Sequence, residues 1–174
     1  KCLCGYDTKK ETSITTKKED AVRRCIRGYE CNFTAKEKLK HLVSKDAFDI
    51  EGLGKKVVDN FWKLNLIKTP ADIFNLDYKK IEKLDGWGDV SIKNLKNAIN
   101  NSKNIVLDKF IFSIGIRHIG QENAKTLANY FKKSVKFSEL FNSTKRKEIL
   151  KNLDDLDGIG ETPVSYTHLR AHET

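Results

Sequence analysis

The chain has 174 residues, of which 39% are hydrophobic, and 33 Lys and Arg residues against 24 acidic ones give a net charge of +9. This composition indicates a globular protein of one or two domains. The sequence has neither the roughly 20 consecutive apolar residues that span a bilayer nor a signal peptide at its start, so we expect a cytoplasmic protein without a membrane partner. The positive charge favours a polyanionic partner such as nucleic acid, although a solvated charged surface would show the same excess.

All the cysteines lie within the first 31 residues: Cys2, Cys4, Cys25 and Cys31. A reducing cytoplasm disfavours disulfides, and four clustered thiolates are typical of a closed, structural zinc site. Four free thiols remain the alternative. Only Leu3 separates the first pair, where zinc knuckles usually have two residues, so Cys2 is the weakest of the four predicted ligands. We predict a zinc-finger module over residues 1–33.

From residue 34 onward the pattern is helical. Thr34, followed three residues later by Glu37, predicts a capping box and a helix start, and Thr69-Pro70 predicts another. Apolar residues recur at intervals of three and four, so strand signals are scarce. The predicted fold class is mainly α, with a small Cys4 module followed by a helical domain over residues 34–162.

A short phrase recurs four times in this domain: "IEGLG" from Ile50, "LDGWG" from Leu84, "IRHIG" from Ile116 and "LDGIG" from Leu156. A helix start follows each one, so the phrase predicts a tight turn between two helices. Backbone N–H groups at such a helix start, with no side chain on the preceding glycine, can bind a phosphate directly.

One of these phrases contains "KLDG", the K-x-D-G pattern of enzymes that attach a nucleotide to their own lysine. However, "LDG" recurs at Leu156 with an aspartate in front of it, so the turn explains it without catalysis. We interpret Lys83 as an exposed helix residue rather than a nucleophile.

The repeated phrase resembles the helix-hairpin-helix motif, which grips the DNA backbone across the minor groove without reading sequence. Four cysteines, then "KEKLKHLVSKDAFDIEGLG", "TPADIF" and "FIFSIGIRHIGQENAKTLANYF", resemble the C-terminal half of bacterial NAD-dependent DNA ligases. That resemblance implies a Cys4 zinc finger followed by a tandem helix-hairpin-helix domain of four motifs, the last one truncated. The spacing from Cys4 to Cys25 is longer than the family's.

The resemblance also implies a function. The parent enzyme would seal nicks in DNA during replication and repair, using NAD and magnesium that this fragment does not itself bind. The upstream catalytic domains are missing here, so the fragment has no catalytic residue and should be inactive alone. We expect a monomer that binds structural zinc and nicked duplex DNA.

The residues predicted to contact DNA are those of the turns and the helix starts. They are Gly52, Gly54, Lys55, Lys56, Gly86, Gly88, Lys93, Arg117, His118, Gly120, Gly158 and Gly160. His118 stands where the other turns have glycine, and its β-carbon should keep DNA further away.

Residues 163–174 show no adequate apolar stripe, and we interpret them as a non-native tail. The alternative function is a stand-alone helix-hairpin-helix module of another repair protein, binding DNA or a protein partner. A helix-hairpin-helix glycosylase with an iron-sulfur cluster fits less well, because its cysteines follow the motif instead of preceding it.

Overall fold

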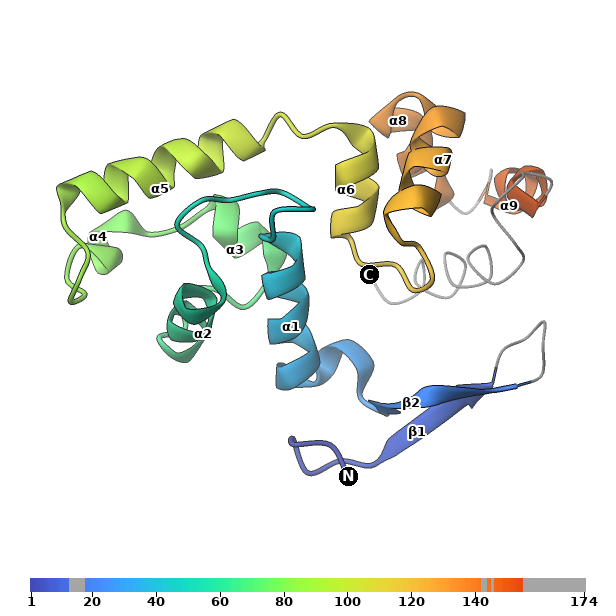
Figure 1. Ribbon diagram of the computed structural model, residues 1–174, viewed down its shortest axis with the longest axis horizontal. Coiled ribbons are helices and arrows are strands. Elements are labelled where there is room, and N and C mark those ends of the chain that lie inside the picture. The colour runs from blue at the N-terminus through green and yellow to red at the C-terminus, as the bar shows by residue number, and fades with distance from the viewer. Residues whose placement is uncertain (13–17, 142–143, 145, 155–174) are drawn as a thin grey trace. The chain divides into compact units, whose positions relative to one another are not determined.

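The computed structural model describes residues 1–12, 18–141, 144 and 146–154 (Figure 1). The chain forms two compact units, each built from two segments. The first unit combines Lys1–Thr8 with Cys25–Ile105, and the second combines Lys9–Arg24 with the chain from Val106 onward.

The first unit is helical apart from its cysteine module. Its elements are the 3-10 helix η1 (Gly28–Glu30), α1 (Asn32–Leu42), α2 (Lys55–Lys63), α3 (Pro70–Phe74), α4 (Tyr78–Ile81) and α5 (Asp89–Ser102). α1 packs against α2, and α3 against α5. Phe61, Ile73, Ile81 and Leu95 are among the fully buried side chains of their common core.

The second unit joins a β-hairpin to the remaining helices. The elements are β1 (Thr8–Thr12) and β2 (Glu19–Cys25), which pair with each other, then α6 (Leu107–Ser113), α7 (Gln121–Phe131), α8 (Ser134–Ser138), η2 (Glu139–Phe141) and α9 (Arg146–Asp154). α6 packs against α7, and Ile111, Leu127 and Phe137 lie in the core between the helices. The fold-class prediction of a mainly α chain with a cysteine module is therefore confirmed.

Two predicted helix starts have different outcomes. Thr69 caps α3 as expected, and Asp72 closes the capping box by accepting the backbone N–H of Thr69 at 2.7 Å. Thr34 was the wrong N-cap for the first helix, because the N-cap of α1 is Cys31, three residues earlier, and the helix begins at Asn32. The capping-box pattern thus gave the right helix but missed its first turn.

Lys83 is exposed, as predicted, but it lies in the turn after α4 instead of within a helix. Across the described residues, no helix has both the length and the apolar character needed to cross a bilayer.

Candidate nucleic-acid interface and metal centre

The first three repeats form the same turn. In each, the apolar residue before the final glycine donates its backbone N–H to the carbonyl three residues earlier: Leu53 to Ile50 at 3.2 Å, Trp87 to Leu84 at 3.2 Å, and Ile119 to Ile116 at 3.1 Å. The middle residue has a positive φ in every case, 88° at Gly52, 83° at Gly86 and 60° at His118. Glycine favours that conformation and histidine tolerates it, so the backbone geometry accounts for these positions.

A helix follows each turn in the same register. Gly54, Gly88 and Gly120 are the N-caps of α2, α5 and α7, and all three have an extended backbone. Their carbonyls accept the N–H groups of Val58, Ile92 and Ala124 at 3.0, 3.1 and 2.9 Å. The same three side chains are buried, so one turn-and-helix unit is used three times.

Among the described residues, neither packing nor backbone conformation requires glycine at these caps. A β-carbon added to Gly54, Gly88 or Gly120 would meet no atom within 4 Å, and none of the three has a positive φ. Ser, Asp or Asn would cap the helix at least as well, by accepting an N–H of the first turn. Instead, no side chain caps these helix starts. The three glycines therefore leave exposed N–H groups at the start of each helix.

Predicted lysines accompany the first two caps. Lys55 and Lys56 form the first turn of α2, Lys93 lies in α5 one turn after its cap, and all three are exposed. In α7 the corresponding Lys125 pairs with Glu122 at 2.8 Å, so part of its charge is already compensated. The first turn of α2 contains no acidic residue, whereas Asp89 lies in the first turn of α5 and Glu122 in that of α7, so the positive charge beside the caps is greatest at the first turn.

The third turn differs in its side chains. Arg117 pairs with Asp20 at 2.7 Å and also with Glu11, so its guanidinium contacts two carboxylates of the β-hairpin. His118 is exposed; partial desolvation of its ring and the neighbouring guanidinium lower its pKa, which keeps it neutral at neutral pH. Sequence reasoning missed Glu11 and Asp20, because no local pattern links them to a turn about a hundred residues later.

The fourth predicted turn, with Gly158 and Gly160, lies outside the described residues, as does the tail at 163–174. Their predicted roles stay predictions.

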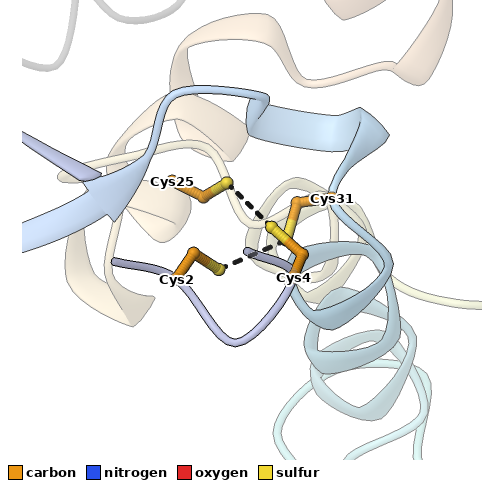
Figure 2. A group of neighbouring side chains, drawn as sticks. All are labelled: Cys2, Cys4, Cys25 and Cys31. Carbon is orange, nitrogen blue, oxygen red and sulfur yellow. Dashed lines mark hydrogen bonds between the residues drawn. The ribbon is translucent and has the colours of Figure 1, made fainter. Parts of the chain in front are cut away.

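The cysteine module brings its four thiols together (Figure 2). The Sγ atoms of Cys2, Cys4, Cys25 and Cys31 all lie within 4.8 Å of one another. Cys2 lies 3.7 Å from Cys31, and Cys4 lies 3.5 Å from Cys25. A tetrahedral ion with bonds of about 2.3 Å to sulfur separates its ligands by about 3.8 Å, so the cluster fits a four-thiolate metal site. The short spacing between Cys2 and Cys4 does not keep Cys2 out of the cluster.

The thiols also differ in acidity. Burial raises the pKa of Cys25 to about 12. Burial acts the same way on Cys31, but the backbone N–H and the hydroxyl of Thr34 outweigh it and lower the pKa of Cys31 to about 6. Cys31 is the N-cap of α1, where a thiolate is also favoured by the helix dipole.

Known proteins that resemble this chain share a name. A DNA ligase of Pelagibacter ubique is 52% identical over 162 residues, which cover 92% of this chain and 23% of that protein. The chain matches one part of a DNA ligase. A DNA ligase of Azorhizobium caulinodans is 39% identical over 185 residues, and one of Rickettsia bellii is 44% identical over 151 residues.

The match covers 91% of this chain for the Azorhizobium caulinodans protein and 82% for the Rickettsia bellii protein. The predicted resemblance to DNA ligases is thus confirmed. The chain spans about a quarter of the length of these curated relatives. No protein-family model matches it.

Proposed function

We propose that this chain is the DNA-holding part of an NAD-dependent DNA ligase, from the C-terminal half of that enzyme. It grips the sugar-phosphate backbone of nicked duplex DNA, without sequence specificity, while other domains of the enzyme seal the nick with NAD and magnesium. In this role the chain acts as a monomer in the cytoplasm and supplies no catalytic residue.

The cap glycines carry this proposal. Neither packing nor backbone conformation among the described residues requires glycine at positions 54, 88 and 120. Ser, Asp or Asn would cap each helix better. Without a side chain at the N-cap, a ligand can approach the backbone N–H groups of the first helical turn closely. A phosphate oxygen binds such N–H groups directly. Lys55 and Lys56 add positive charge beside the first of these caps, and Lys93 offsets Asp89 beside the second.

The four cysteines support a structural zinc ion. Thiolate ligands suit zinc, and four of them leave no open position for a water or a substrate. Cys2, Cys4, Cys25 and Cys31 would hold the ion, and its contribution would be to fix the ends of the β-hairpin and the start of α1. The zinc site would therefore be structural and would take no part in catalysis.

Arg117 and His118 remain predicted DNA contacts in the third turn. Both act more weakly than the lysines in this proposal, because Arg117 is paired with carboxylates and His118 is neutral.

The test is a titration of the chain with a nicked duplex and an intact duplex of the same sequence, at several salt concentrations. Backbone binding predicts an affinity that falls steeply with salt on both duplexes. Gly88→Val should weaken binding by at least about tenfold, since one charge-assisted contact is lost. Asn100→Val, an exposed change on α5 that leaves the net charge unaltered, is the matched control. A folded chain that binds neither duplex at low salt would favour a protein-interaction module instead.

A further inference from the structure

The third turn has the backbone geometry of the first two, but its positive charge is already compensated. Gly120 is an open, extended cap like the other two cap glycines. Arg117, within the turn, is paired with carboxylates, and Lys125 is paired with a glutamate of its own helix. Partial desolvation and the neighbouring guanidinium lower the pKa of His118, which keeps its ring neutral at neutral pH. These three side chains therefore offer little net positive charge to a phosphate.

The β-hairpin of the same unit holds Arg117. The Nη2 atom of Arg117 lies 2.7 Å from a carboxylate oxygen of Asp20 in β2, and its Nη1 atom pairs with Glu11 in β1. A guanidinium presents its N–H groups as a planar fork that binds carboxylates and phosphates in the same way. The two carboxylates therefore occupy the N–H groups that a DNA phosphate would use.

This pairing can be exchanged for another anion. The exposed fractions of the side chains are 17% for Arg117, 29% for Glu11 and 26% for Asp20, so water reaches all three. Ion pairs that water reaches contribute little to stability, because the solvent screens them. Asp20 also pairs with Arg24 at 3.2 Å, so it keeps a cation if Arg117 turns away. A phosphate can therefore take the guanidinium without leaving Asp20 unpaired.

We propose that Glu11 and Asp20 compete with DNA for the guanidinium of Arg117, so that the hairpin forms an autoinhibitory contact at the third turn. The inference rests on the proposed DNA-binding function. In the free chain the guanidinium stays on the two carboxylates, and a phosphate that approaches Gly120 must displace them. The third turn then adds less to the affinity for DNA than its backbone would permit. Neutralising the carboxylates converts it into a stronger phosphate site.

The test is a salt titration of the full chain with a nicked duplex, comparing the unmodified chain with the double variant Glu11→Gln, Asp20→Asn. The double variant should bind about threefold to tenfold more tightly at low salt. Its slope of log affinity against log salt should be steeper by about one, because one more cation reaches a phosphate. Thermal unfolding of each sample checks that it is folded.

A matched variant separates this effect from that of net charge. Asp46→Asn, Glu148→Gln also removes two negative charges from exposed positions, and neither side chain has an ion pair among the described residues. This control should change the slope much less. Adding Arg117→Gln to the double variant should return the slope to that of the unmodified chain, whereas adding it to the control should have little effect.

A single variant serves if the double variant does not fold. Asp20→Asn keeps the pairing of Arg117 with Glu11, so it disturbs the hairpin less. It should give part of the same increase in slope, with Glu148→Gln as its control.

The two proposals can fail separately. If the unmodified chain binds DNA in a salt-dependent way but the double variant has the slope of the control, the carboxylates only hold the fold. The competition is then overturned, and the backbone grip stands. An increase in slope that survives Arg117→Gln would overturn it as well. If neither the unmodified chain nor the double variant binds DNA, the DNA-binding function is wrong, and this inference fails with it.

Discussion

The guanidinium of Arg117 lies 2.7 Å from the carboxylate of Asp20, although 97 residues separate them in sequence. Glu11 of the adjacent strand pairs with the same guanidinium. Removing Arg117 would take one cation from each of these carboxylates, although Asp20 keeps a second ion pair with Arg24 at 3.2 Å. We therefore predict that Arg117→Gln destabilises the chain, and that adding Asp20→Asn recovers part of the loss. A double-mutant cycle measured by chemical denaturation checks this, and additive effects of the two changes would contradict the pairing.

The same pairing predicts a difference among the basic residues in DNA binding. Lys55→Gln should reduce the slope of log affinity against log salt by about one, because an exposed cation beside a cap is lost. Arg117→Gln should reduce that slope by less, since carboxylates already compensate its charge. Lys83→Ala is the control, exposed but in the turn after α4. Equal slope changes at positions 55 and 117 would show that Arg117 leaves its carboxylates to bind phosphate.

Gly88→Ser should change stability and affinity in opposite directions. Serine caps a helix slightly better than glycine, so the free energy of unfolding should stay equal or rise by about 0.5 kcal/mol. Affinity for duplex DNA should fall, because the new side chain occupies the space that a phosphate oxygen needs. Thermal unfolding and a binding titration on one sample measure both quantities.

Gly86→Ser, two residues earlier, is the contrasting variant. Its φ is 83°, which serine adopts only at a cost of about 1–2 kcal/mol, although its β-carbon would meet no atom. We expect this variant to be less stable than the unmodified chain. A Gly88→Ser variant that loses as much stability as Gly86→Ser would mean that the cap glycine serves the fold.

From the clustering of the four thiols we predict that each chain binds one zinc ion through all four cysteines. Cys25→Ser should lower the zinc content and the melting temperature, because the remaining thiolates no longer enclose the ion. Ser134→Ala, at an exposed position outside the cysteine module, is the control. Elemental analysis together with thermal unfolding gives both results. Cys2→Ser tests the unusual spacing, and full zinc content in that variant would remove Cys2 from the ligand set.

The ion pairs of Asp59 predict how the stability of the chain changes at acidic pH. It pairs with Lys36 at 3.0 Å and Lys40 at 3.1 Å, and these ammonium groups lower its pKa. The unfolded chain then binds the proton more readily than the folded chain, so Asp59 stabilises the fold above its unfolded pKa of about 3.9. That contribution disappears as the pH falls toward the lower folded pKa. Asp59→Asn should lower stability at neutral pH and flatten its decline below about pH 5, as denaturation across pH 3–7 would show.

Local sequence determined much of this protein. The mainly helical fold, the start of α3 at Thr69 and the turns at Gly52 and Gly86 follow from nearby residues, because glycine placement and capping are short-range effects. The clustering of the cysteines followed from composition and spacing. The repeat was visible because one turn-and-helix unit recurs with the same buried positions.

Tertiary structure decided the rest. The pairing of Arg117 with Glu11 and Asp20 depends on segments about a hundred residues apart meeting within one unit, and no periodicity records such a meeting. The open space around the cap glycines likewise exists only once the helices have packed. Local sequence specifies which backbone conformations are favourable. Packing across the whole unit decides which side chains are buried and which stay exposed to solvent.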